Sequence, residues 1–336
     1  MKKLSTQNKY KSLINNIGEI LEEGRKQTFV AVNNILVKTY WEIGRSIVEY
    51  EQAGNEKAEY GSKLLNKLAK DLKFNYGKGF SISNVYIMRQ FYIKYPKFQT
   101  VSGKLSWSHY VELLGVSDDL ARGFYEKQCI KDKWSVRELR RQANSMLFER
   151  IALSKDKKGV LELSKKGQLI KQGQDVIKEP YILEFLGIPE NHQYSEKELE
   201  QKIIDNLQMF LLELGKGFTF VKRQFRITLN NTHFYVDLVF YHRILKCFVL
   251  IDLKIGAVNH LDVGQMNMYL NYFKAEENSK DDNPPIGLIL VADKNEVMIE
   301  YALGGISSKL FISKYKLYLP DKNELAKRVK KLLKDK

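Results

Sequence analysis

The sequence predicts a two-domain α+β protein, in which an all-helical N-terminal domain precedes an α/β sandwich around a mixed central sheet. Apolar residues recur every three or four positions through most of residues 10–152, which is the period of an amphipathic helix. Beyond residue 181, helical patterns and short β-rich runs follow in the order α-β-β-β-α-β-α-β-α. A length of 336 residues accommodates about two domains of ordinary size.

The composition is that of an ordinary folded protein, with 44% hydrophobic and 28% charged residues. No window of about 18 uncharged apolar residues occurs, so we expect no transmembrane helix. The basic first residues lack a following apolar stretch, so we expect no signal peptide. Cys129 and Cys247 are too few for a disulfide scaffold and too far apart for a CxxC zinc pair. We therefore expect a cytoplasmic protein.

The chain is strongly basic, with 55 Lys and Arg against 40 Asp and Glu, a net charge of +15. The excess lies mainly in residues 1–150, which hold 26 basic and 16 acidic residues against 29 and 24 in the remainder. Such a balance favours a polyanionic partner such as nucleic acid, although a Lys-rich genome produces the same balance.

The N-terminal half contains a pattern compatible with a helix-turn-helix. Residues 64–72 and a helix ending before Pro96 flank the turn at residues 75–81. The second helix would expose polar side chains that suit phosphates or base edges, namely Asn84, Arg89, Gln90 and Lys94. An ordinary helical hairpin with a solvated polar face explains the same pattern.

Further helices are expected at residues 107–114 and 136–152. Within the second, Arg137, Arg140 and Arg141 are spaced to share one side and form a basic ridge for a phosphate backbone, unless Glu138 and Glu149 pair with them. Residues 154–180 are rich in Lys, Gly and Gln, and we expect a linker region there. The domains would then be residues 1–153, a basic domain for substrate or partner binding, and residues 181–336.

The second half begins with a capping box at Ser195 and Glu198, which opens a helix to about Leu214. The remaining expected elements are strands at residues 218–229, 234–241 and 247–254, a helix near 263–273, a strand at 286–292, a helix at 296–303, a strand at 311–319 and a terminal helix.

Two acids lie in strongly apolar strands of this half. The alternation in residues 234–240 predicts one wholly apolar face, with Asp237 on the opposite face. The run from Cys247 is continuously apolar up to Asp252, which is typical of a central strand buried on both faces. Asp252 and Lys254 share a face. A buried charge there is costly unless it is paired, hydrogen-bonded or bound to metal.

Carboxylates from neighbouring strands can hold a hard cation such as Mg²⁺, and a nearby lysine can orient a metal-bound water. A salt bridge between Asp252 and Lys254, with Asp237 exposed on an edge, is the alternative. Glu200 adds a third acid, because it precedes Ile203, Ile204 and Leu207 at helical spacing and so falls on the core-facing stripe. Glu200 could equally be a boundary residue beside Lys197.

These residues resemble the PD-(D/E)XK nuclease signature, with Asp237 as the first acid and Asp252-Leu253-Lys254 as the (D/E)-x-K element. Gln265 and Tyr269 resemble the Q-x-x-x-Y motif of RecB-like members. Over nearly the whole chain, the sequence resembles the YhcG-type PDDEXK proteins, which have a second N-terminal domain of unassigned function. The segments that carry this match are residues 40–44, 105–110, 134–140, 210–218, 223–226, 234–243 and 264–270.

The resemblance implies a restriction-endonuclease-like α/β sandwich over residues 181–336 and hydrolysis of nucleic acid, DNA rather than RNA, by a Mg²⁺- or Mn²⁺-activated water. By position, Asp237, Asp252 and Glu200 would bind the metal, and Lys254 would assist the water. Gln265 and Tyr269 would support Lys254 or contact the strand, unless they only pack the helix. In the family the middle acid is usually Glu, and Asp252 is one methylene shorter.

The resemblance also places Arg223, Gln224 and Arg226 in a matching segment, and we expect them, together with Arg137, Arg140 and Arg141, to contact nucleic acid. Two other hypotheses remain: a non-catalytic binding protein that keeps a nuclease-like fold, and a homo-oligomer or protein partner held through the N-terminal domain.

Overall fold

The computed structural model describes residues 2–52, 61–97, 103–189, 193–293, 309–319 and 321–334. The chain divides into two compact units, residues 1–122 with 133–139 and residues 123–132 with 140–336. The second unit thus begins before residue 153, where the sequence pattern places the end of the helical domain.

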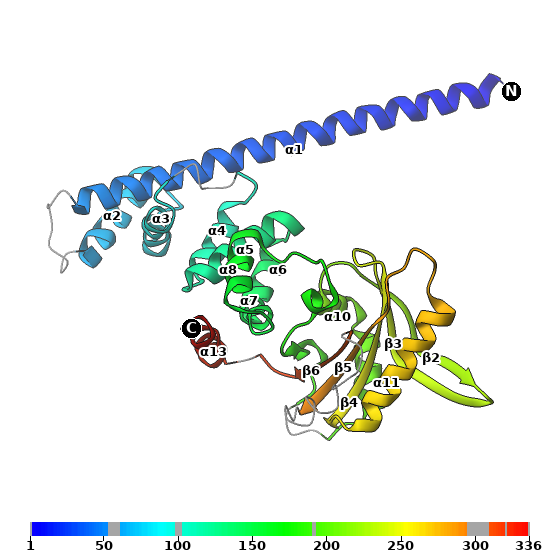
Figure 1. The fold of residues 1–336 in the computed structure, drawn as a ribbon. Helices are drawn as coiled ribbons and strands as arrows, with labels where there is room; N and C mark the ends of the chain where they lie inside the picture. The colour runs from blue at the N-terminus through cyan, green and yellow to red at the C-terminus, as the bar shows by residue number, and fades with distance from the viewer. Residues whose placement is uncertain are drawn as a thin grey trace. The chain divides into compact units, whose positions relative to one another are not determined.

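Among its described residues, the first unit contains the helices α1 (Lys2–Tyr50), α2 (Gly61–Tyr76), α3 (Ile82–Lys94) and α4 (Trp107–Leu114). Helix α3 begins where the Ser81 hydroxyl accepts a hydrogen bond from the Asn84 backbone N–H, as a helix N-cap does. The second half of α1 packs on α3, whereas the first half extends away from the other helices of this unit (Figure 1).

The crossing of α1 and α3 explains two residues of the segment 40–44. A Cβ atom at Gly44 would lie 2.0 Å from the Met88 carbonyl oxygen, so only glycine permits this close approach. Trp41 is buried and donates a hydrogen bond from Nε1 to the Tyr95 carbonyl at 2.6 Å. These residues therefore determine the packing of the first unit.

The polar residues expected on a recognition helix are mostly engaged within this unit. The Arg89 guanidinium lies 2.8 Å from the Glu51 carboxylate, and the Lys94 ammonium lies 3.1 Å from Asp119. The Asn84 amide donates to the Gly79 carbonyl oxygen. This arrangement is that of a helical hairpin whose polar side chains support the fold.

Helices α5 (Asp119–Asp132) and α6 (Val136–Asn144) contribute residues to both units, and α7 (Leu147–Ala152) and α8 (Lys157–Lys166) belong to the second. The sequence predicts one helix over 136–152, but Met146 adopts a left-handed conformation with φ of 54° and separates α6 from α7. The stretch expected as a linker, 154–180, contains α8 and buries Val160, Leu163 and Val176. It is part of the second unit, because its apolar side chains pack there.

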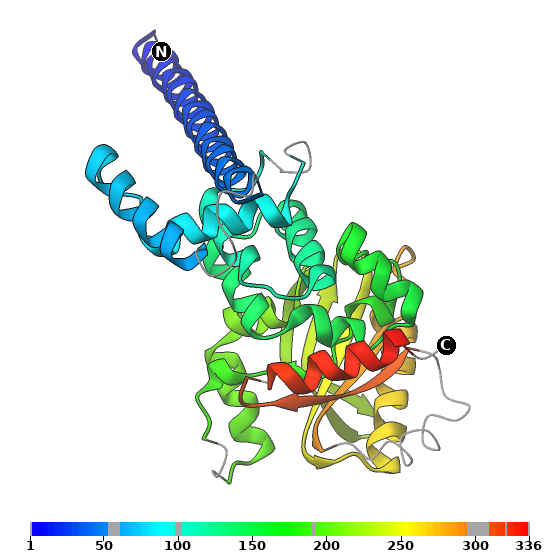
Figure 2. The same ribbon diagram turned by 90° about the vertical axis from the view of Figure 1, so that its left-hand side faces the viewer.

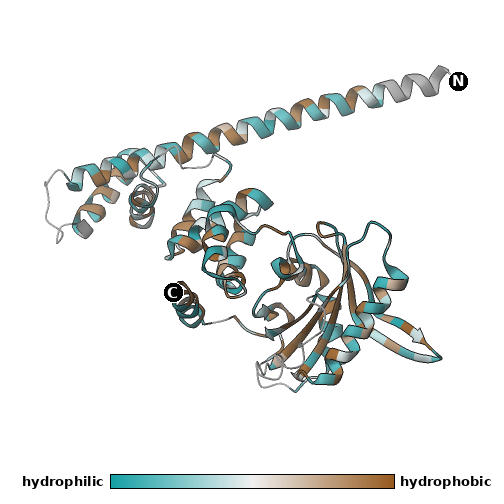
Figure 3. Ribbon diagram, viewed as in Figure 1, coloured by the Kyte–Doolittle hydropathy of each residue, from teal (hydrophilic) through white to brown (hydrophobic). Residues whose placement is uncertain are grey.

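The second unit is built on a sheet with the order β1-β6-β5-β4-β3-β2. Its strands are β1 (Tyr181–Ile182), β2 (Phe218–Leu229), β3 (Thr232–His242), β4 (Cys247–Ala257), β5 (Ile286–Asp293) and β6 (Leu310–Lys316). Strands β2, β3 and β4 pair antiparallel, and β4, β5, β6 and β1 pair parallel. The sheet is mixed, and β4 is a central, mainly apolar strand, as predicted (Figure 3).

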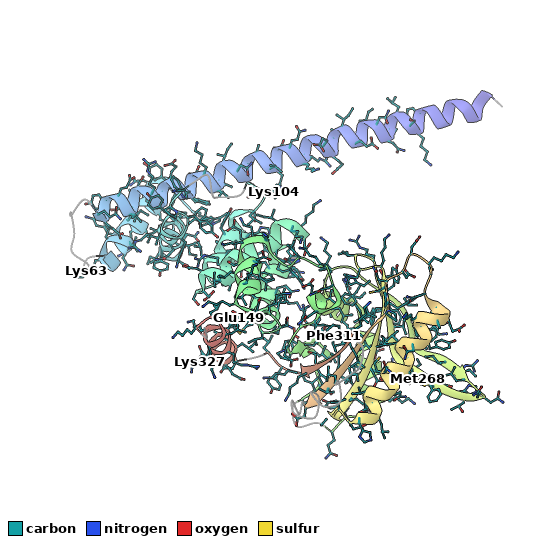
Figure 4. The ribbon with its side chains drawn as sticks, in the orientation of Figure 1. Lys63, Lys104, Glu149, Met268, Phe311 and Lys327 are labelled. Atoms are coloured by element: carbon teal, nitrogen blue, oxygen red, sulfur yellow. The ribbon has the colours of Figure 1, made fainter. Side chains whose placement is uncertain are left out.

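Helices cover both faces of this sheet (Figure 1). Helices α9 (Glu196–Asp205) and α10 (Leu207–Leu214) pack on one cluster of buried side chains, and α11 (His260–Tyr272), which carries Met268 in Figure 4, packs on another. Asn206 separates α9 from α10, where one continuous helix was expected. Helix α13 (Lys322–Lys334) follows β6 in the chain (Figure 2).

The apolar face predicted for β3 does not stay on one side of the sheet. Leu238 and Phe240 belong to the cluster under α9 and α10, whereas Phe234 and Val236 belong to the cluster under α11. The change falls at Asp237, where β3 extends beyond its pairing with β4. Simple alternation therefore fails at the position of the first predicted acid.

A buried ion pair joins α7 to the end of α10. The Arg150 guanidinium donates to the Glu213 carboxylate at 2.5 Å, both side chains are fully buried, and the Ile182 N–H donates to the same carboxylate. Burial raises the pKa of Glu213, but the Arg150 and Lys178 charges outweigh it and hold that pKa below its ordinary value. Removing one partner would leave an uncompensated buried charge.

The helix expected at residues 296–303 lies outside the described residues. Across the described ranges, no helix combines the length and the apolar character needed to cross a membrane.

Candidate active site

Asp237 lies where β3 and β4 part. The β3–β4 pairing ends at Leu238 and Ile251, so the next residues of β4 have no backbone partner on β3. The Leu253 N–H donates instead to the Asp237 carboxylate at 2.8 Å. Asp237 thus takes the place of a strand partner, and its carboxylate is held beside the backbone between Asp252 and Lys254.

Asp252 and Lys254 are in contact, as both readings of the sequence require. The Lys254 ammonium lies 2.7 Å from the Asp252 carboxylate and 3.9 Å from that of Glu196. Asp252 is only 5% exposed. Asp237 is not free on an edge, because its carboxylate accepts hydrogen bonds from the Leu253 N–H and from the Gln224 amide.

The electrostatics of the pair indicate a shortage of positive charge. Burial and the neighbouring Asp237 carboxylate raise the pKa of Asp252 to about 7, although Lys254 opposes the shift. Burial lowers the pKa of Lys254, but the Asp252 carboxylate outweighs it and raises that pKa above its ordinary value. One ammonium therefore does not compensate two adjacent carboxylates, and a cation would do so.

Glu200 faces this cluster from α9. Its side chain is 6% exposed and lies 3.1 Å from the Arg223 guanidinium. The Gln224 amide nitrogen donates both to Glu200, at 2.7 Å, and to Asp237, at 3.0 Å. Burial raises the pKa of Glu200, and the Asp237 charge adds to the effect. The expected core-facing orientation of Glu200 is confirmed.

The donor set fits a hard divalent cation. Mg²⁺ is commonly held by one or two carboxylates while it keeps several waters. Asp237 and Asp252 supply two such groups. The Gln224 side-chain amide lies between Asp237 and Glu200 and donates to both carboxylates. Within the described ranges, no three side chains among His, Cys, Asp and Glu converge into a ready-made metal cage. The three acids still lie around one site, with the Gln224 amide nitrogen between Glu200 and Asp237.

Gln265 and Tyr269 act together on β3. The Gln265 amide donates to the Tyr269 hydroxyl at 2.5 Å, and that hydroxyl donates to the Tyr235 carbonyl at 2.9 Å. Burial raises the pKa of Tyr269 to about 12. In the described part of the chain, no hydrogen bond joins either residue to Lys254. Their contacts hold the strand two residues before Asp237.

The six residues expected to contact nucleic acid lie in different surroundings. Arg226, Arg137 and Arg140 are exposed. Arg223 is paired with Glu200, and the Gln224 amide is committed to the two acids. Arg141 does not share an exposed ridge with Arg137 and Arg140: it is 14% exposed and lies 3.6 Å from Glu213.

The position of Gln224 follows from the hairpin loop between β2 and β3, which the Asn230-Asn231 pair predicts from the sequence. Asn230 and Asn231, with φ of 45° and 64°, form a two-residue hairpin loop. Such a loop determines the register of both strands, and that register places Gln224 opposite Asp237. Glu196, in the first turn of α9, also lies at this site, 3.9 Å from the Lys254 ammonium.

A mixed sheet with helices on both faces, and two aspartates and a lysine where β3 and β4 part, is the arrangement of PD-(D/E)XK nucleases. Comparison with known proteins gives the same class: residues 174–331 match the YhcG PDDEXK nuclease domain, and residues 16–150 match the DUF1016 N-terminal domain. The chain is 39% identical over 349 positions to the Escherichia coli (strain K12) protein named "Putative nuclease YhcG". The alignment covers 94% of this chain and 92% of that protein. The chain belongs to the YhcG family of nucleases.

Solved structures give only distant similarity. A repair endonuclease from Pyrococcus abyssi matches 39% of this chain and 50% of its own length, with a TM-score of 0.28 and 20% identity. EndoMS in a complex with double-stranded DNA matches 40% and 51%, with a TM-score of 0.28 and 15% identity. The chain spans about half of these proteins, and a similarity this low carries no conclusion about substrate.

Proposed function

We propose that this nuclease hydrolyses phosphodiester bonds in DNA, with Asp237 and Asp252 holding Mg²⁺ or Mn²⁺ and Lys254 orienting the attacking water. The observation that carries this proposal is the close group of two carboxylates and one ammonium where β3 and β4 part. A divalent cation bound there would lower the pKa of a bound water and offset charge on the phosphate.

The residues around the cation have separate tasks. Lys254 keeps its proton, because its pKa is raised, and so acts as a hydrogen-bond donor to water and to a phosphate oxygen. The Leu253 N–H and the Gln224 amide hold Asp237 in place. Tyr269 fixes the Tyr235 carbonyl and thereby the approach of β3 to the site. These contacts keep the two carboxylates together despite their repulsion.

The β2–β3 hairpin offers a surface for the nucleic acid beside these acids. Opposite residues of an antiparallel pair share a face of the sheet. Arg226 lies opposite Tyr235, two positions along the strands from Gln224 and Asp237, and so on the same face as those two residues. Both side chains are exposed. A guanidinium can pair with phosphate and a tyrosine ring can stack on a base. We infer that the strand runs along this face towards the hairpin loop.

The test is cleavage of linear duplex DNA, single-stranded DNA and RNA with Mg²⁺, Mn²⁺ or EDTA. We expect cleavage of DNA that requires the metal and is lost in Asp252→Asn and Lys254→Ala. The control variant is Asp281→Asn, which changes an exposed acid of the same unit. Cleavage that survives EDTA, or that both site variants retain, would overturn the mechanism. Binding of DNA without any cleavage would support the non-catalytic alternative, and cleavage of RNA alone would correct the substrate.

A further inference from the structure

The first half of α1 exposes a long apolar stripe. Side chains spaced alternately by four and three positions follow one face of the helix from residue 10 to residue 35, which is the repeat of a coiled-coil seam. Those of the first three turns are 45–71% exposed. The stripe consists of Tyr10, Ile14, Ile17 and Leu21, flanked by Leu13 and Ile20, then the small residues Gly24, Thr28 and Ala31, then Ile35.

This segment is a poor helix on its own. Gly18, Gly24 and the β-branched residues between Thr28 and Val32 have low helix propensity. Helical stability in proteins comes mainly from packing of an amphipathic face. In the described part of the first unit, Asn33 of α1 donates to the Leu105 carbonyl, and Val37 and Trp41 beyond it are buried. The described side chains of residues 10–32, about six turns, are almost all exposed and require a partner.

A groove of about 970 Å³ lies between the second half of α1 and α2. Its floor is apolar, formed by Ile43 and Ile47 of α1 and by leucines of α2. Lys63 and Lys67 line its α2 side, and Figure 4 marks Lys63. Glu42 and Asp71 line the groove as well, so it is an open apolar channel whose rim carries charges of both signs.

The stripe and the groove lie on the same face of α1. On a straight helix of about 3.6 residues per turn, Ser46 lies about ten full turns after Tyr10, and Thr39 and Glu42 lie on the same side; all three line the groove. The groove extends over residues 38–50 of α1, about 18 Å, and the strongly apolar part of the stripe extends over residues 10–21, about 17 Å. One chain therefore has an apolar ridge and a groove of equal length on one surface.

We propose that two copies of this chain pair through α1 in antiparallel orientation, with the stripe of each copy in the α1–α2 groove of the other. A ridge and a groove on the same face of one helix are what a two-fold symmetric interface requires, because each surface then serves twice. A second copy is the occupant that matches both surfaces in length and in apolar character.

The areas agree with a stable dimer. The apolar side chains from Tyr10 to Leu21 leave on the order of 600 Å² uncovered, as large as the largest patch of a typical monomer. Adding the groove would bring each copy to about the 800 Å² of a standard specific interface.

The geometry determines the register. Placing residues 10–21 over residues 39–50 brings Tyr10 opposite Tyr50 and Ile14 opposite Ser46 of the second copy. The two-fold axis then falls between Thr28 and Val32, where Thr28 and Ala31 are small enough for close helix approach.

Light scattering after size-exclusion chromatography tests the pairing with the full chain. Protein concentrations of roughly 5–50 µM lie above the dissociation constant of a moderately tight dimer. We expect twice the 39.2 kDa of one chain, and at least half of the protein as monomer in Ile17→Glu. The control Asn15→Glu adds the same charge two residues away, on the opposite face of α1, and this variant should remain dimeric. A monomeric wild type, or a dimer that Ile17→Glu leaves intact, would overturn the proposal.

Oxidative cross-linking tests the orientation. Both native cysteines are buried, so any cross-link that forms can be assigned to the introduced cysteines. Ile14 and Ser46 are about 48 Å apart along one helix, so a disulfide in Ile14→Cys/Ser46→Cys must join two chains. We expect a covalent dimer from this pair and none from Ile17→Cys alone. Cross-linking by Ile17→Cys alone would show a parallel pair and overturn the groove model.

Discussion

The Asp237 carboxylate on β3 accepts a hydrogen bond from the Leu253 backbone N–H on β4 at 2.8 Å. Leu253 is the residue between Asp252 and Lys254, so this bond ties the first acid directly to the other two groups. It exists because the backbone pairing of β3 and β4 has already ended at Leu238 and Ile251. The same separation that opens the site thus supplies the contact that orders it.

Asp237→Ala and Asp237→Asn should separate stability from chemistry. Both variants should lose at least 100-fold of DNA cleavage, because neither supplies the carboxylate. Asp237→Ala should also lower the free energy of unfolding by about 1 kcal/mol, since the Leu253 N–H loses its acceptor. Asp237→Asn keeps an oxygen for the Leu253 N–H but not a second one for the Gln224 amide, and should be destabilised less than Asp237→Ala in urea unfolding. Equal destabilisation of the two would contradict this role for the hydrogen bond.

Asp252→Asn should raise thermal stability in the absence of metal. The pKa of Asp252 is raised from 3.8 to about 7, so its contribution to stability is largest at low pH and is lost as pH rises through that range. At pH 8 the variant should melt about 2–6 °C above wild type, and at pH 4 the two should be similar. Differential scanning fluorimetry in EDTA measures this.

The same variant tests metal binding without reference to activity. Mg²⁺ should raise the melting temperature of wild type at pH 8, because a ligand that binds the folded state stabilises it. It should have little effect on Asp252→Asn, whereas Asp281→Asn should respond like wild type. An unchanged Mg²⁺ response in Asp252→Asn would remove Asp252 from the metal site.

Tyr269→Phe tests whether the Gln265–Tyr269 pair does more than pack α11. The ring stays, but the hydrogen bond to the Tyr235 carbonyl is lost. We expect a loss of stability of about 1 kcal/mol and a fall in kcat of roughly tenfold with KM little changed, because the position of β3 beside Asp237 loosens. A fall in stability with unchanged kcat would reduce the pair to a packing role.

Arg226→Ala tests the hairpin surface. In the cleavage-deficient Lys254→Ala background, DNA affinity should fall several-fold, and the slope of log K against log salt should decrease by about one ion. The matched control is Arg243→Ala, which removes an exposed arginine just beyond the far end of β3. If Arg243→Ala weakens binding as much as Arg226→Ala does, the effect is general charge and not a hairpin contact.

Sequence alone identified Asp237, Asp252 and Lys254, because charges in continuous apolar strands are too costly to occur without a partner. It also predicted the helical first half, five of the six described strands in their order along the chain, and the inward face of Glu200, but not β1 or the order of the strands in the sheet. Periodicity carries this information, since burial of one face repeats along the chain.

Only the tertiary structure showed that β3 and β4 part at Asp237, that Gln224 holds two acids, and that Arg141 is buried against Glu213. It also placed residues 154–180 inside the second unit and left the described apolar side chains of residues 10–21 exposed. Local patterns record which residues avoid water, but not which side chains they meet. Those partners are distant in sequence, and only the folded chain brings them together.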